Sequence, residues 1–252
     1  MVDKFYTIKQ NVDFIYSLIN LEKFDLVIEP SAGDGVFLDY LLRHNIPFRA
    51  YDIEPHHASI QEQDFLTLEL DRPDGCNILT IGNPPFGTNN SLAIRFFNKA
   101  AEFSSSIALI LPKSFRKPSV INRLDRHFHL IADVNLPTEE YRNGTNLVSV
   151  PTFFQVWDRG DGIRPIIKSQ VTSDKIAFVG QDDANYTIRR VGAKAGIAFA
   201  DVNRSKQSHY FIYTELPDFL TKWNDVVWPF DDDVGCHSLT KGQIIEKIDE
   251  LF

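Results

Sequence analysis

The segment EPSAGDGVF, residues 29–37, follows the short apolar run FDLVIE, residues 24–29, and is the most informative stretch for the fold. An apolar run of this length predicts a buried strand. Gly33 and Gly35 stand one residue apart and predict a turn in which the backbone passes close to a ligand. The pattern after the turn predicts a helix over residues 33–43, whose first backbone N–H groups point toward the same ligand. Strand, glycine turn and helix together predict one unit of a parallel α/β sheet.

Strand and helix signals go on alternating along the first half of the chain. This alternation is typical of a doubly wound, Rossmann-like α/β sheet. The run at residues 152–157 alternates in a way that suits an antiparallel edge strand. Further strands are expected over residues 48–53, 77–81, 106–111 and 129–135, and helices over residues 11–21, 91–103 and 119–127.

A turn-rich segment, DRGDG at residues 158–162, predicts a domain boundary. We therefore expect a first domain over residues 1–158 and a C-terminal region over residues 159–252. The second part carries weaker signals and predicts a small α+β appendage. Its expected strands cover residues 163–167, 175–179 and 209–214, and its expected helix covers residues 239–251.

Composition excludes several classes of protein. The chain has 252 residues, of which 43% are hydrophobic and 24% charged, as in a soluble globular protein and not in a disordered or collagenous one. No apolar run approaches the roughly 20 residues that cross a bilayer, and the polar N-terminus predicts a cytoplasmic protein without a secretory leader. Cys76 and Cys236 lie far apart without a motif, so we expect two reduced thiols and no metal site.

The net charge of −8 argues against indiscriminate binding to a polyanion. Two segments are nevertheless basic, over residues 113–126 and 185–210. Such runs are often no more than solvated faces, and they can equally contact nucleic acid. The sequence leaves both interpretations open.

Two acidic residues are placed to help bind a ligand beside the glycine turn. Asp52 ends the second expected strand, where a carboxylate can accept both hydroxyls of a ribose. Asp64 and the aromatic Phe65 follow near the same edge. Either acid can instead be a turn or cap residue. A dinucleotide-binding G-x-G-x-x-G motif is absent, because Leu38 stands where the third glycine belongs.

The most specific motif is NPPF, Asn83-Pro84-Pro85-Phe86, directly after the expected strand ILTIG. Two prolines stiffen the chain and hold the asparagine at the sheet edge. The amide oxygen and a nearby carbonyl are acceptors that suit a substrate with an NH₂ group. The phenylalanine ring offers a flat face on which a planar group can stack.

In this order, the glycine turn, Asp52, Asp64 and NPPF resemble the motifs of S-adenosylmethionine-dependent amino-methyltransferases that modify the exocyclic N6 of adenine. The segments KFYT (4–7) and LPKSFR (111–116) add to the resemblance, which covers about the first 158 residues. Segments SHYFI (208–212) and SLTKG (238–242) resemble small phage and bacterial enzymes of this kind only loosely. The resemblance implies a class I methyltransferase fold and S-adenosylmethionine as cofactor, with a catalytic domain followed by a target-recognition region.

The resemblance also implies roles for individual residues. Catalysis falls to Asn83, Pro84, Pro85 and Phe86, which would hold the amine. Basic side chains of both halves would bind nucleic acid: Lys113, Arg116, Lys117, Arg189, Arg190 and Lys194. Cofactor binding falls to Tyr6, Thr7, Glu29, Pro30, Ser31, Ala32, Gly33, Gly35, Phe37, Asp52, Ile53, Asp64, Phe65 and Asn83.

Other target classes stay open at this point. The size of the C-terminal region favours DNA over RNA, although nothing in NPPF distinguishes the two. Glutamine-modifying protein methyltransferases use a similar motif, but they carry an N-terminal helical domain for which the residues before the first strand are too few. An inactive binding module and a nicotinamide-dependent oxidoreductase are weaker alternatives, since the motifs are intact and the third glycine is missing.

Overall fold

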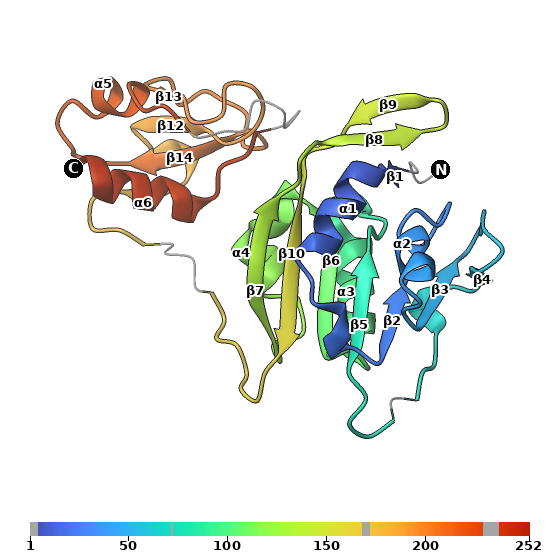
Figure 1. Ribbon diagram of the computed structural model, residues 1–252. Helices are drawn as coiled ribbons and strands as arrows, with labels where there is room; N and C mark the ends of the chain where they lie inside the picture. The colour runs from blue at the N-terminus through green and yellow to red at the C-terminus, as the bar shows by residue number, and fades with distance from the viewer. Residues whose placement is uncertain (1–4, 72, 168–171, 229–236) are drawn as a thin grey trace. The chain divides into compact units, whose positions relative to one another are not determined.

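The computed structural model describes residues 5–71, 73–167, 172–228 and 237–252 (Figure 1). The chain divides into two compact units, residues 1–167 and residues 168–252. Cys236, for which a reduced thiol was expected, lies outside the described residues. Among the helices that the structure describes, none has the length and apolar character needed to cross a membrane.

The first unit is built on a seven-stranded sheet of order β4-β3-β2-β5-β6-β10-β7. Strands β2 to β6 are parallel, and β10 is antiparallel to both β6 and β7. The order reverses between β2 and β5, the place where open α/β sheets bind their ligands. The expected Rossmann-like α/β fold is confirmed. The strands are β2 (Leu26–Glu29), β3 (Phe48–Asp52), β4 (Gln61–Glu62), β5 (Ile78–Gly82), β6 (Ser106–Pro112), β7 (Phe128–Asn135) and β10 (Thr152–Arg159).

Helices cover both faces of this sheet, which is why its central strands are almost wholly apolar. On one face α1 and α2 pack through Ile15 and Leu41. On the other, α3 packs through Phe97 and the segment around α4 through Val120. The helices are α1 (Lys9–Ser17), α2 (Leu38–Arg43), α3 (Ser91–Ala101) and α4 (Pro118–Ile121).

A separate three-stranded sheet of order β1-β8-β9 was not expected from the sequence. Strand β1 (Tyr6–Thr7) pairs with β8 (Glu140–Asn143), which forms a hairpin with β9 (Asn146–Ser149). Figure 1 shows this hairpin beside the N-terminal segment. The pairing holds residues 6 and 7 in place, although β1 is too short to produce an alternating sequence pattern.

Four expectations about elements were wrong in detail. Strand β10 is not an edge strand but lies between β6 and β7, which agrees with the complete burial of Phe153 and Phe154. Helix α2 begins at Leu38 and not at residue 33, because Gly33 and Gly35 have φ angles of 52° and 82°, outside the helical region. The helix expected over residues 119–127 is the short α4, and residues 163–167 form no strand.

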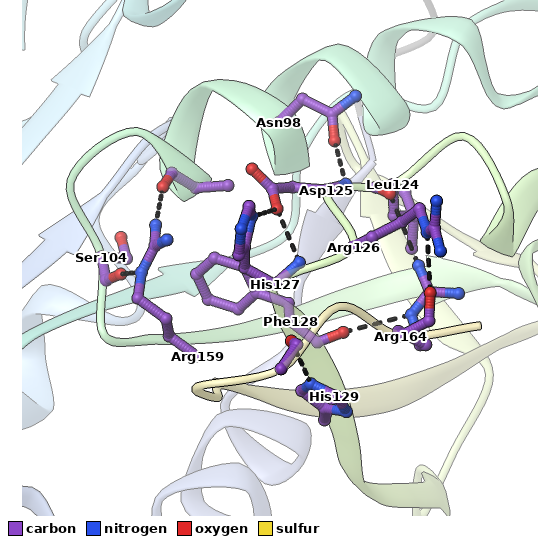
Figure 2. A network of polar contacts seen from close by, with 12 residues as sticks. Asn98, Ser104, Leu124, Asp125, Arg126, His127, Phe128, His129, Arg159 and Arg164 are labelled. Atoms are coloured by element: carbon purple, nitrogen blue, oxygen red, sulfur yellow. Dashed lines mark hydrogen bonds and ion pairs between the residues drawn. The ribbon is translucent and has the colours of Figure 1, made fainter. Parts of the chain in front are cut away.

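The first unit ends at residue 167, not at residue 158, because the segment after β10 is bonded to it (Figure 2). Arg164 is buried, and its guanidinium donates to the carbonyls of Phe128 (3.2 Å) and Ile121 (2.9 Å). The backbone N–H of Arg164 donates to the carbonyl of Arg126 at 2.7 Å, and Nε of Arg126 donates back to the carbonyl of Arg164. These long-range bonds leave no sequence signal, whereas the turn formers at residues 158–162 do.

The second unit is a four-stranded antiparallel sheet of order β11-β14-β12-β13 packed against two helices. Trp223 and Ile245 are fully buried in its own core. Thr240 caps the last helix in a capping box with Gln243, which explains where that helix begins. The elements are β11 (Ala177–Phe178), β12 (Tyr186–Arg189), β13 (Ala198–Phe199), β14 (His209–Tyr213), α5 (Phe219–Asn224) and α6 (Lys241–Leu251).

Candidate active site

A cavity of about 780 Å³ opens at the carboxyl ends of β2 and β5, entirely within the first unit. It lies at the point where the strand order reverses. All the predicted cofactor and catalytic residues line it except Gly35. The lining residues are Phe5, Tyr6, Thr7, Glu29, Pro30, Ser31, Ala32, Gly33, Asp34, Val36, Phe37, Asp52, Ile53, Gln63, Asp64, Phe65, Leu66, Asn83, Pro84, Pro85, Phe86, Gly87, Thr88, Leu92, Arg95 and Phe96.

The glycine turn is shaped by its neighbours. A Cβ added at Gly33 would lie 2.8 Å from Cε1 of Tyr6, so the ring of Tyr6 packs directly on the turn. Gly35 does not line the cavity and instead packs on His57. Both glycines have positive φ angles, which only glycine adopts without strain.

Asp52 and Asp64 line the cavity and also bond to the backbone. Oδ2 of Asp52 accepts the N–H of Gly33 at 2.8 Å, and its Oδ1 accepts the N–H of Glu54. Asp64 caps a 3₁₀ turn by accepting the N–H of Leu66 at 2.9 Å. The structural and the ligand-binding interpretations of these acids are therefore compatible, because a carboxylate has more acceptor sites than these bonds use.

Glu29 is a buried carboxyl at the floor of the cavity. Its exposed fraction is 2%, and its Oε2 is buried without a hydrogen-bond partner among the described residues. Burial, and secondarily the charge of Asp52, holds the pKa of Glu29 well above its ordinary value. A Cβ added at Gly82 would lie 3.3 Å from Cγ of Glu29, so this carboxyl packs against the residue that precedes the NPPF motif.

In the side-chain amide of Asn83 the nitrogen is hydrogen-bonded, whereas the oxygen has no partner among the described residues. Its Nδ2 donates to the backbone carbonyl of Phe5 at 3.1 Å and to Oγ1 of Thr7 at 3.2 Å. Its Oδ1 is buried and has no partner within the described residues. The backbone carbonyl of Asn83 accepts a 3.1 Å bond from Oγ of Ser31, which joins the motif to the glycine turn. A buried acceptor without a donor costs on the order of 1–3 kcal/mol, which a ligand N–H can recover.

Apolar side chains give the cavity flat walls. Phe65 is buried and stacks on Phe96 with ring centroids 5.4 Å apart, while Phe86 is only partly buried. Ile53 is 71% exposed at the rim, which is unusual for a large aliphatic side chain. Planar groups can be covered between such walls.

The charges around the cavity favour a cationic ligand. Four acidic residues line it against one basic residue, Arg95. A pyrophosphate would be repelled by this set, whereas a sulfonium and an ammonium group would be attracted. The unpartnered Oε2 of Glu29 is a suitable acceptor for the ammonium group, so the residues present fit S-adenosylmethionine. The described residues contain no group of three His, Cys, Asp or Glu side chains that could hold a metal ion.

The predicted basic residues lie outside the cavity. In the first unit Lys113 is paired with Glu139 at 2.9 Å, and Arg116 is paired with Asp133. These acids come from elsewhere in the chain, so the basic character of residues 113–126 is partly neutralised. Lys117 is half-buried; in the second unit Arg189 and Arg190 are half-buried and Lys194 is exposed.

Sequence reasoning missed several lining residues. Phe5 and Asp34 lie within the KFYT and EPSAGDGVF segments but were given no role of their own. Arg95 and Phe96 lie in the second turn of α3, nine and ten residues after Phe86, and their distance from the motif along the chain hid them. Within the described residues, Arg95 is exposed and makes no hydrogen bond or ion pair.

Comparisons with known proteins support the methyltransferase class. Residues 39–140 match a family model described as EDM2 methyltransferase-like domain. In sequence, the chain resembles methyltransferases. Protein ENHANCED DOWNY MILDEW 2 of Arabidopsis thaliana is 27% identical over 180 residues, which is 60% of this chain and 13% of that protein. The chain therefore spans only a small part of its curated relative.

Solved structures show likeness of fold at low identity. The methyltransferase subunit of a type I restriction-modification system from Streptococcus thermophilus is 14% identical with a TM-score of 0.44, covering 63% of this chain and 46% of that chain. An rRNA methylase from Streptococcus thermophilus is 14% identical with a TM-score of 0.39, covering 60% and 94% respectively. The match to the methyltransferase-like family model supports methyl transfer as the class of reaction.

Proposed function

We propose that the chain is an S-adenosylmethionine-dependent methyltransferase that modifies the exocyclic N6 of adenine in DNA. The observation that carries this proposal is the buried Oδ1 of Asn83, unpartnered among the described residues, in an acid-lined cavity that Phe86 also lines. An acceptor beside an aromatic ring suits a planar base that presents an NH₂ group.

The residues of the glycine turn would hold the cofactor. The carboxylate of Asp52 suits ribose hydroxyls, and Glu29 suits the ammonium group. Ile53 and Phe65 would cover the adenine ring of the cofactor. When bound, S-adenosylmethionine supplies an electrophilic methyl group on a sulfonium.

The NPPF motif would then orient the target amine. Asn83 Oδ1 and the Pro84 carbonyl accept its two hydrogens, so that the nitrogen lone pair is directed away from the ring. Held in this way, the target nitrogen would accept the methyl group that the bound cofactor supplies and would then lose one proton to solvent. The ring of Phe86 would hold the base flat during this step.

The second unit offers a surface that suits a polyanion, and we assign residues 168–252 to target binding. Arg190 and Lys241 lie over the ring of Tyr210, at 5.6 and 6.0 Å from its centroid, and Lys241 also lies 4.6 Å from that of Phe178. Cations beside aromatic rings are typical of single-stranded nucleic-acid surfaces. A base in a duplex must leave the stack to reach the cavity, at a cost of a few kcal/mol.

One experiment tests the proposal. The protein is incubated with methyl-labelled cofactor and, in parallel, unmethylated duplex DNA, single-stranded DNA, RNA and a protein mixture, and the modified unit is identified after digestion. We expect N6-methyl-2′-deoxyadenosine from a DNA sample, and no transfer by Asn83→Ala, which should still bind cofactor. Label in RNA adenine or in protein glutamine would replace the DNA assignment, because a glutamine amide also presents an NH₂ group. Absence of label from every acceptor would contradict the proposal.

A further inference from the structure

The N-terminal segment around strand β1 contacts the side-chain amide of Asn83 in the NPPF motif. This amide can adopt two orientations. An asparagine amide presents its oxygen on one side and its NH₂ group on the other, and a rotation of about 180° exchanges them. Only one of these orientations presents the acceptor that a target amine needs. The prolines that follow restrict the backbone at Asn83, but they do not choose between the two orientations of its side chain.

The backbone carbonyl of Phe5 makes this choice. It lies 3.1 Å from Nδ2 of Asn83, and a carbonyl oxygen can only accept. Rotating the amide would bring two acceptor oxygens together at that distance, without a proton between them. The hydroxyl of Thr7 accepts from the same Nδ2 at 3.2 Å. Both N–H groups of Asn83 are thus engaged by residues 5–7, and Oδ1 is left without a partner.

The position of Thr7 is itself enforced by the fold. Its exposed fraction is 5%, and it pairs with Tyr141 of strand β8. Its neighbour Tyr6 pairs with Arg142, which forms an ion pair with Asp34 of the glycine turn. The hairpin therefore holds residues 6 and 7 against both the cofactor turn and the motif.

We infer that Thr7 and the Phe5 carbonyl are positioning groups that set Asn83 with its oxygen toward the target amine. Thr7 acts on the amine through Asn83. This inference rests on the proposed function and adds a determinant of turnover that the NPPF motif alone does not contain. It also requires asparagine rather than aspartate at residue 83, because a carboxylate presents no N–H to the Phe5 carbonyl.

Three variants test this inference in the full chain. Thr7→Val removes the acceptor at nearly constant volume and should lower kcat about fivefold, the equivalent of one hydrogen bond of about 1 kcal/mol, with less change in the Kd of the cofactor. Thr7→Ser should restore kcat. Asn83→Asp keeps an acceptor toward the amine and should still lose at least about tenfold in kcat, because it faces the Phe5 carbonyl. Thr80→Val is the matched control, since Thr80 is a buried threonine bonded to Ser104 at 2.7 Å.

The outcomes separate this inference from the proposed function. Wild-type kcat in Thr7→Val or Asn83→Asp would overturn the inference and leave the function intact. Equal losses in Thr7→Val and Thr80→Val would also overturn it, since general loss of stability would then explain both. A wild-type protein that labels no acceptor would contradict the proposed function instead.

A measurement that does not depend on turnover tests the inference even for a wild-type protein that labels no acceptor. The side-chain amide protons of Asn83, identified in ¹⁵N spectra by their loss in Asn83→Asp, should exchange slowly with solvent. Thr7→Val should accelerate that exchange, and Thr7→Ser should not. Exchange that is equally fast in all three proteins would overturn the inference.

Discussion

The hydroxyl of Ser31 donates a hydrogen bond of 3.1 Å to the backbone carbonyl of Asn83, a residue 52 positions away in the sequence. Ser31 belongs to the glycine turn after β2, and Asn83 follows β5, its neighbour in the sheet. This bond joins the part of the site that would hold the methyl donor to the part that would hold the acceptor. A substitution in either part of the site is therefore expected to alter the other part.

Ser31→Ala should lower kcat about fivefold, because it removes one hydrogen bond of about 1 kcal/mol from the backbone of the motif. The thermal midpoint should fall only slightly, since Ser31 is half-buried and close to solvent. Steady-state kinetics and a thermal melt measure both effects. A large loss of stability with normal kcat would show that the bond only supports the fold.

Asp52→Ala should weaken cofactor binding by about ten- to a hundredfold, the effect of removing a charged hydrogen-bonding partner. The carboxylate would be lost both to the ligand and to the N–H of Gly33, which it accepts at 2.8 Å. Titration calorimetry gives the Kd. Asp39→Asn is the matched control, because Asp39 is exposed near the turn but does not line the cavity. Unchanged affinity in Asp52→Ala would contradict the proposed role.

Glu29 should make both stability and binding depend on pH. Burial raises its pKa, so the folded protein holds this proton more tightly than the unfolded chain does. The stabilisation is complete below the ordinary pKa of 4.5 and is lost as pH rises through the folded pKa. A cationic ligand favours the carboxylate, so cofactor affinity should rise with pH and binding should release a proton.

Glu29→Gln should abolish this dependence. The variant should show weaker cofactor binding and a flatter stability curve above pH 4.5 than the wild type. Thermal melts across the pH range and calorimetry in buffers of different ionisation enthalpy measure the two effects. Identical proton release from both proteins would assign the proton to another group.

Arg95→Gln should reduce the salt dependence of nucleic-acid binding. Each phosphate contact adds about 0.9 to the slope of log K against log salt for a duplex. Arg95 lines the cavity without an ion pair among the described residues, whereas Lys113 is already paired with Glu139. Lys113→Gln should therefore change the slope less, and Arg49→Gln, an exposed control outside the cavity, should not change it. A larger effect at Lys113 than at Arg95 would reverse this assignment.

The double variant Arg189→Gln, Arg190→Gln should weaken nucleic-acid binding and lower the salt slope, if the second unit contacts the backbone of the target. Arg190 lies 5.6 Å from the ring centroid of Tyr210, so its charge stands beside an aromatic ring. Lys222→Gln is the control, because Lys222 lies over Phe252 instead. Equal salt slopes in the wild type and the double variant would contradict the role of this surface in nucleic-acid binding.

The chain's local patterns predicted the fold and most of the site. Apolar runs, the glycine turn and NPPF each occupy a few consecutive residues, and parallel strands bring their carboxyl ends to one edge. Placing Asp52 near Gly33 required only that consecutive parallel strands lie side by side, as β2 and β3 do. Features without a local pattern were missed: the two-residue strand β1 was not expected, although its residues Tyr6 and Thr7 were, and Arg95 lies beyond the motif on α3.

Sequence alone determined that this protein has a parallel α/β sheet with a glycine turn, two acids and an NPPF motif at one edge. Only the tertiary structure decided that the amide of Asn83 is held by Phe5 and Thr7, 78 and 76 residues away, and that Lys113 and Arg116 are paired with distant acids. The reason is physical. Strand and turn propensities arise from neighbouring residues, whereas burial, charge pairing and the direction of an amide depend on whichever segments the fold brings into contact.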